Sequence, residues 1–116
     1  MDNFDDRNTA VLKKMLEEIA YLQDYTKGMT EETFLDAEDK KRVVSMTLIN
    51  MGELVRHFTK DFRKTVKTIP LDDIIGLRDI AAHGYKSLKF TRIWNTIIKD
   101  IPMLEIEIKK LLQSLK

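Results

Sequence analysis

One segment of this chain gathers side chains that could do chemistry: Arg78-Asp79-Ile80-Ala81-Ala82-His83-Gly84-Tyr85. Histidine titrates near neutral pH and is suited to proton transfer. If a helix continues through His83, Asp79 lies four residues before it on the same face. The Asp79 carboxylate could then accept a hydrogen bond from one imidazole nitrogen and orient the ring. Arg78 must reach around the helix end to share this site, and Tyr85 could fold back toward it.

The same residues also have a plainer interpretation. Charged side chains near a helix end stabilise the helix in any protein, so Arg78, Asp79 and His83 taken alone are more often a solvated cap or a local salt bridge. Tyr85 taken alone is more often a half-buried packing residue. The other histidine, His57, lacks companion ligands, so it is expected at the surface or at an interface rather than at a metal.

Helices must position this segment, and the spacing of apolar residues predicts four main ones. They are expected at about residues 5–27, 37–58, 70–83 and 88–115. Gly28 is expected to stop the first helix and Pro70 to begin the third. Pro102 is expected to kink or break the last helix near Asp100. Gly52, inside the second helix, is expected to permit a close helix crossing.

The composition favours one small helical domain. Dividing 116 residues would leave pieces too small to bury a good core, so residues 1–116 are expected to form a single domain. Four glycines and two prolines are too few turn residues for a chain of many short strands. Residues 30–35 predict a capped turn, and residues 60–69 could hold a short helix. The predicted fold class is therefore all-α, an antiparallel bundle of four to five helices.

The composition also excludes several classes of function. The absence of cysteine removes disulfides, thiolate catalysis and cysteine-based zinc sites. No metal and no cofactor is expected. The acidic N-terminus has no apolar signal region, and no apolar run approaches the length needed to span a bilayer, so the protein is expected in the cytoplasm. With a formal net charge of +1, any contact with nucleic acid would have to be local.

The ordered landmarks of the chain resemble the HepT-like group of HEPN proteins. The segment has that family's pattern of Arg, four residues, His, one residue, Tyr. Other stretches resemble further family landmarks and extend the likeness over nearly the whole chain: residues 28–35, 50–53, 74–77, 94 and 99–102. Two positions depart from the pattern, because Asp79 stands where asparagine is commoner and Leu71 where tryptophan is often found. The negative charge of Asp79 could weaken the binding of a phosphate.

This resemblance implies a HEPN-like up-and-down bundle and a metal-independent endoribonuclease toxin. Cleavage of RNA by its own 2′-hydroxyl needs a base for that proton, an acid for the leaving 5′-oxygen, and positive charge at the phosphorane. His83 would be the acid or base, and Arg78 would stabilise the phosphorane. One chain supplies one histidine in the motif, so a symmetric homodimer with its cleft on the two-fold axis would supply both proton roles.

The resemblance also implies a protein partner, a minimal nucleotidyltransferase antitoxin. In this family, the antitoxin is understood to transfer AMP to the motif tyrosine. Tyr85 is then both a positioning residue and the acceptor of AMP. A bulky anionic group at Tyr85 would block the cleft and repel RNA phosphates.

Basic residues indicate where RNA could approach the site. Three of them follow the motif closely and are placed to guide phosphates toward it: Lys86, Lys89 and Arg92. A second cluster could form a track for the RNA backbone or simply a solvated basic face: Arg56, Lys60, Arg63, Lys64 and Lys67. Trp94 lies on the apolar stripe of the last helix and is expected in the core rather than stacked on a base.

Two other classes of function stay open beside the nuclease. One is a non-catalytic helical dimer that holds a nucleotidyltransferase or a nucleotide in the same cleft. The other is a purely structural helical partner, which would be indifferent to Arg78 and His83. Loss of RNA cleavage in a His83→Ala protein that remains a folded dimer would distinguish the enzyme from both.

Overall fold

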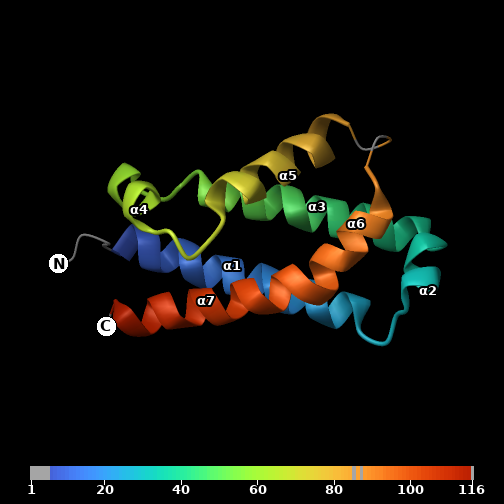
Figure 1. The fold of residues 1–116 in the computed structure, drawn as a ribbon, viewed down its shortest axis with the longest axis horizontal. Helices are drawn as coiled ribbons and strands as arrows, with labels where there is room; N and C mark the ends of the chain where they lie inside the picture. Colours follow the sequence, from blue (N-terminus) through green and yellow to red (C-terminus); the bar gives the residue numbers. More distant parts are fainter. Residues whose placement is uncertain (1–5, 85, 87, 116) are drawn as a thin grey trace.

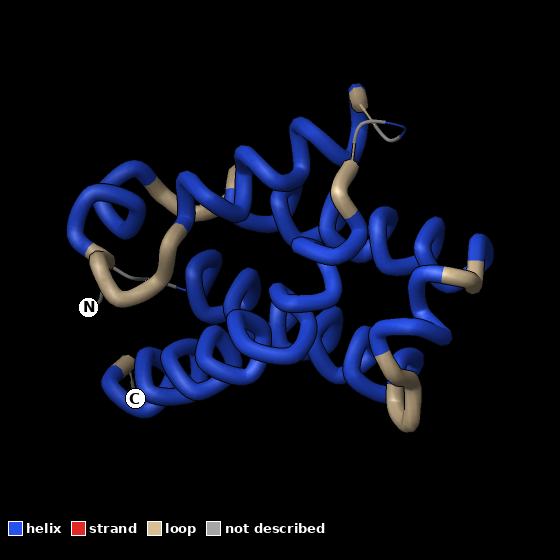
Figure 2. The backbone as a smooth tube through the Cα atoms, turned by 45° about the vertical axis from the view of Figure 1, so that its right-hand side comes forward, coloured by secondary structure: helices blue, strands red, loops and turns tan. Residues whose placement is uncertain are grey.

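The chain folds into helices joined by short loops (Figure 2). This computed structural model describes residues 6–84, 86 and 88–115. No strand occurs among these described residues. The all-α class predicted from the sequence is confirmed. Tyr85, one of the candidate residues, lies outside the described part of the chain.

The helices run up and down along one long direction, as Figure 1 shows. Their bounds are α1 Asp6–Thr26, α2 Glu31–Leu35, α3 Glu38–Val55, α4 Lys60–Thr65, α5 Leu71–His83, α6 Phe90–Asn95, the π-helical turn η2 Thr96–Asp100, and α7 Ile101–Ser114. The four predicted main helices correspond to α1, α3, α5 and the continuous run α6–η2–α7. The short helices α2 and α4 lie within the connections, where a capped turn and a short helix were expected.

Local signals set the connection between α1 and α3. Gly28 has a φ of 81°, a left-handed value that glycine tolerates, and it ends α1 as predicted. Thr30 caps α2 by accepting a hydrogen bond from the Thr33 N–H, and the Thr33 hydroxyl accepts one from the Thr30 N–H. This reciprocal cap turns Phe34 into the core, where it is fully buried.

The end of α3 differs from the prediction, because the helix stops at Val55 rather than at Phe58. The cause is a contact from α1. The buried side chain of Asn8 accepts a hydrogen bond from the Thr59 N–H at 3.0 Å and donates one to Thr59 Oγ1 at 3.1 Å. Thr59 in turn caps α4 by accepting a hydrogen bond from the Phe62 N–H. The start of α1 therefore fixes where the chain leaves α3.

The last helical run contains the irregularity that Pro102 predicts. It begins at Phe90, slightly later than expected, and passes through the π-helical turn η2 just before α7. Pro102 has no N–H to donate to the carbonyl of Ile98, so the regular ladder cannot continue there. The wider turn lets the run bend while Ile97 and Ile101 both stay buried.

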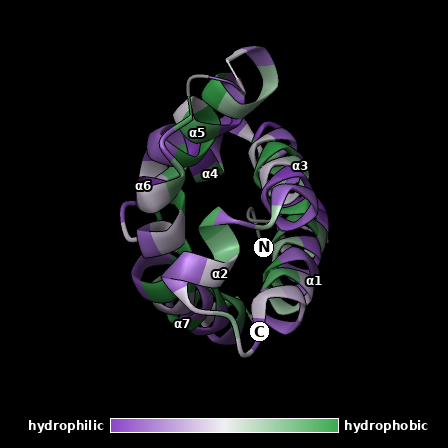
Figure 3. Ribbon diagram, turned by 90° about the vertical axis from the view of Figure 1, so that its right-hand side faces the viewer, coloured by the Kyte–Doolittle hydropathy of each residue, from purple (hydrophilic) through white to green (hydrophobic). Residues whose placement is uncertain are grey.

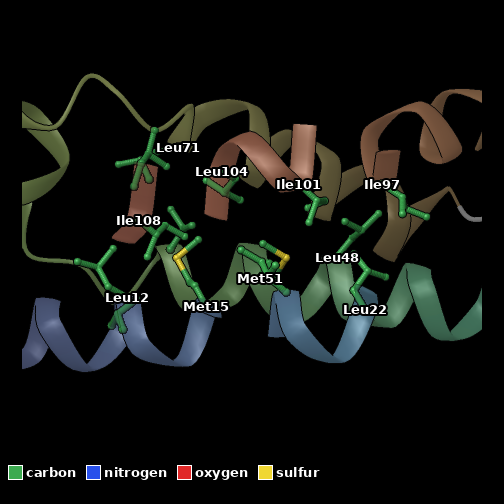
Figure 4. Close-up of a cluster of buried hydrophobic side chains, with 14 of the residues drawn as sticks. Leu12, Met15, Leu22, Leu48, Met51, Leu71, Ile97, Ile101, Leu104 and Ile108 are labelled. Atoms are coloured by element: carbon green, nitrogen blue, oxygen red, sulfur yellow. The ribbon is translucent and has the colours of Figure 1, made fainter. Parts of the chain in front are cut away.

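A continuous apolar core lies between α1, α3 and the α6–η2–α7 run. Figure 3 looks along the bundle and shows α1 and α3 on one side, α6 and α7 on the other, and α5 at the top. Figure 4 shows that α1, α3, η2 and α7 all contribute side chains to this core: Leu12, Met15, Leu22, Leu48, Met51, Ile97, Ile101, Leu104 and Ile108. Trp94 is 8% exposed and packs against Phe34, so its predicted place in the core is confirmed.

The helix α5 packs chiefly on α3 and stands apart from α6 and α7 (Figure 1). Only Leu71 and Ala81 of α5 are buried, whereas Ile80 is 51% exposed. Among the described residues, no helix is both long and apolar enough to cross a membrane. The helix that carries the candidate motif is thus held on one face and open on the other.

Candidate catalytic site

The helix α5 presents the motif at its C-terminal end. It continues to His83, and the Gly84 N–H donates a hydrogen bond to the Ile80 carbonyl at 2.7 Å, which completes the last turn. Asp79 and His83 therefore lie one helical turn apart, as the spacing predicts. His83 is exposed, so its imidazole is accessible to a substrate.

Arg78 is placed by the crossing of α5 over α3. A methyl group built on Gly52 would overlap Cβ of Arg78, would lie 2.6 Å from Arg78 Cγ, and would lie 3.4 Å from the Ile74 carbonyl oxygen. Gly52 therefore permits the close crossing predicted from the sequence, and the residue that uses the space is Arg78. The stem of this arginine lies flat against α3, and its side chain is only 20% exposed.

Two carboxylates hold the guanidinium of Arg78. Glu53 Oε1 lies 2.8 Å from Arg78 Nε, although the N–H, which is shielded from solvent, does not point along this line. Asp79 Oδ1 accepts a hydrogen bond from Arg78 Nη1 at 3.0 Å. Nη2 of Arg78 makes no ion pair with any described residue. Each fork of the guanidinium thus has one nitrogen engaged, Nε or Nη1, and Nη2 is the nitrogen that can bind an anion.

Arg56, just past the end of α3, joins the same carboxylates. Its Nη2 lies 3.3 Å from Asp79 Oδ1, and its Nε lies 3.5 Å from Glu53 Oε1. The sequence placed Arg56 only in a general basic cluster and Glu53 only in a family landmark. Glu53 and Arg56 reach Arg78 and Asp79 only because α3 and α5 cross closely. The feature of the sequence that could have indicated these contacts is Gly52, which is followed by Glu53 and then by Arg56.

Asp79 faces the arginines in this structure. Among the hydrogen bonds between described residues, none joins Asp79 to His83. The carboxylate that could have oriented the imidazole instead accepts hydrogen bonds from Arg78 and Arg56. Asp79 therefore contacts Arg78 and Arg56 rather than His83 in the described part of the chain.

Two of the three basic residues after the motif border an open groove. The groove measures about 1080 Å³ and lies between α5 and the α6–η2–α7 run, with Leu48 and Met51 of α3 also in its lining. Lys89 and Arg92 line it, and Lys86 is exposed nearby in sequence. Apolar residues of α5 and α7 line it as well, including Ile80, which is half exposed.

The remaining candidates do not join the motif. His57 is exposed and lines a shallow hollow of about 320 Å³ between α1 and α3, beside Lys14 and Glu17. No group of three or more His, Asp or Glu residues suited to a metal ion occurs in the described part of the chain. The basic residues of α4, Lys60, Arg63 and Lys64, are exposed.

Comparison with known proteins shows that a family model and several curated proteins match most of this chain. The family model described as "Ribonuclease HepT-like" matches residues 15–111. "Putative RNase TTE0752" of Caldanaerobacter subterraneus subsp. tengcongensis is 34% identical over 105 residues, which are 90% of this chain and 94% of that protein. "Putative RNase MJ1216" of Methanocaldococcus jannaschii is 29% identical, over 92% of this chain and 88% of that protein. "Probable ribonuclease HepT" of Thermococcus cleftensis is 27% identical, over 86% of this chain and 91% of that protein. No solved structure is a significant match.

Proposed function

This chain belongs to the HepT-like ribonuclease family, and we propose that it is a metal-independent endoribonuclease, the toxin of a toxin–antitoxin pair, acting in the cytoplasm. The observation that carries the proposal is the arrangement at the end of α5. Two nitrogens of the Arg78 guanidinium are held by carboxylates and Nη2 has no ion pair with a described residue, while His83 is exposed one turn beyond Asp79. These two residue types can supply the proton transfer and the positive charge that cleavage of RNA without a metal requires.

The proposed reaction uses the 2′-hydroxyl of the RNA as the nucleophile. A neutral histidine removes the 2′-proton, the 2′-oxygen attacks phosphorus, and the bond from phosphorus to the 5′-oxygen breaks. A protonated histidine gives its proton to the leaving 5′-oxygen. The products are a 2′,3′-cyclic phosphate and a 5′-hydroxyl. Arg78 stabilises the charge that builds on the phosphorane oxygens.

Two proton roles call for two histidines, and a homodimer would supply them. The open faces of α5 and α7 support this assembly, because Ile80 of α5 and Met103 of α7 are 51% and 65% exposed beside the groove. The groove is also acidic toward one end and basic toward the other. Asp72 and Asp73 line it at the start of α5, and Lys89 and Arg92 line it at the start of α6 (Figure 1). A second copy related by a two-fold axis would set the basic end of one protomer against the acidic end of the other.

The partner proposed for this toxin is a minimal nucleotidyltransferase antitoxin, with Tyr85 as its target. In the proposed transfer, the phenolic oxygen of Tyr85 attacks the α-phosphorus of ATP and pyrophosphate leaves. Tyr85 is close to His83 in sequence, and the negative charge of an AMP group on it would repel the RNA phosphates. Family membership and the tyrosine at this motif position support the assignment.

The alternative is a helical binding module without catalysis, and one observation favours it. The charge of Arg78 is already offset by Glu53 and Asp79, which an incoming phosphate must compete with. Such a module would bind its nucleotidyltransferase partner through the same cleft.

The test is RNA cleavage in excess EDTA by purified, unmodified protein, beside the His83→Ala protein, with the dimer content of both measured. We expect cleavage by the first and a loss of at least about 100-fold in the second, since one proton-transfer group contributes about that much. A matched control is His57→Ala, which removes the exposed histidine outside the motif and should leave cleavage unchanged. No cleavage by a folded, unmodified dimer would overturn the nuclease and favour the binding module.

A further inference from the structure

We propose that Arg56 is a positioning residue for Arg78. Arg56 binds both carboxylates that hold Arg78, and it thereby keeps the Arg78 guanidinium available to an RNA phosphate. The inference rests on the proposed function, because it names a residue that supports the phosphate-binding arginine of that site.

In this network of four side chains, one oxygen of each carboxylate is shared by the two arginines. Glu53 Oε1 lies 2.8 Å from Nε of Arg78 and 3.5 Å from Nε of Arg56. Asp79 Oδ1 lies 3.0 Å from Nη1 of Arg78 and 3.3 Å from Nη2 of Arg56. Arg56 therefore competes with Arg78 for both acceptor oxygens, and neither carboxylate is committed to Arg78 alone.

The charge balance explains why this competition matters. Two arginines and two carboxylates sum to zero, so the network does not repel an anion. Without Arg56, a single guanidinium would lie between two carboxylates, and the group would carry one net negative charge next to the scissile phosphate. Arg56 supplies the compensating positive charge.

A role in stability alone does not account for the network. The side chains of Arg56, Glu53 and Asp79 are 47%, 48% and 48% exposed. Ion pairs this accessible to solvent contribute little to the free energy of unfolding. Arg78 is the more buried of the two arginines, at 20% exposure. The outer arginine is thus placed to tune the inner one.

A double-mutant cycle that removes one positive charge, one negative charge, or both tests the proposal. The proteins are wild type, Arg56→Gln, Asp79→Asn and the double variant, whose four-group networks carry net charges of about 0, −1, +1 and 0. The probe is an oligoribonucleotide made non-cleavable by 2′-deoxy substitution, and kcat/KM for cleavable RNA is measured in parallel. We expect Arg56→Gln to weaken binding of the probe roughly three- to tenfold, and the addition of Asp79→Asn to restore it. If Arg56 were only structural, removing a second member of the network would make the damage worse.

Two further variants sharpen the test. Arg42→Gln makes the same change at an exposed arginine within α3, which pairs with Glu38 at 3.2 Å, and it should leave probe binding unchanged. Arg56→Lys keeps the charge and should retain most of the affinity, which also covers the case in which Arg56→Gln does not fold.

The outcomes separate this inference from the proposed function. Wild-type cleavage with no rescue of Arg56→Gln by Asp79→Asn would overturn the role of Arg56 and leave the nuclease intact. Absence of cleavage in every protein, with probe binding that still follows the double-mutant cycle, would overturn the nuclease and leave the role of Arg56 intact. Equal losses in Arg42→Gln and Arg56→Gln would mean that only the overall charge matters, and would also overturn the inference.

Discussion

The guanidinium group of Arg78 does three things at once: it contacts Glu53, donates a hydrogen bond to Asp79, and leaves Nη2 open. A lysine keeps the charge and the aliphatic stem over Gly52, but it offers one ammonium in place of a planar fork. We therefore expect Arg78→Lys to fold normally and to lower kcat by roughly 100-fold or more, as the loss of a transition-state donor does. Single-turnover cleavage with saturating RNA measures this loss directly.

The control is the thermal unfolding midpoint of Arg78→Lys, which should differ little from that of wild type. Turnover close to wild type in the lysine protein would mean that positive charge alone is sufficient. The planar arrangement of donors held by Glu53 and Asp79 would then have no part in catalysis.

At the scale of the element, Gly52 sets how closely α5 approaches α3. Alanine is the better helix former by about 1 kcal/mol, so Gly52→Ala should stabilise an isolated helix. Here its methyl group would overlap the stem of Arg78, and α5 would have to shift. We expect Gly52→Ala to lower both the free energy of unfolding and the cleavage rate, the rate by roughly tenfold or more because small displacements of positioned groups are costly.

Gly76→Ala is the matched change on α5. A methyl group at Gly76 meets no atom within 4 Å, so this variant should keep or raise the free energy of unfolding, by up to about 1 kcal/mol. Denaturant unfolding of both proteins decides the matter. If Gly52→Ala gained stability as Gly76→Ala does, the crossing would have room to spare, and the account of how Arg78 is held would be wrong.

The elements that could be predicted from the sequence are those with local causes. Apolar spacing indicated α1, α3, α5 and the last run, while Gly28 and Pro102 marked a helix end and an irregular turn correctly. The end of α3 was predicted too late because Asn8, far away in the chain, pairs with Thr59.

The candidate site divides in the same way. Its motif residues are adjacent in sequence, and the resemblance found them. The Arg56 contact to Asp79 spans two helices, and only the packed structure brings these residues together.

At the scale of the whole molecule, a composite site predicts that activity depends on both protomers of a dimer. Wild-type protein is mixed with His83→Ala protein at equal total concentration and allowed to exchange subunits. If each site needs both histidines, only dimers of two wild-type chains cleave, so an equal mixture should retain about a quarter of the full activity. If each chain works alone, about half remains. Differently tagged subunits verify that exchange is complete. A linear fall of activity with the wild-type fraction, after complete exchange, would assign both proton roles to groups within one chain, and His83 would then share them with a residue other than its copy in the partner.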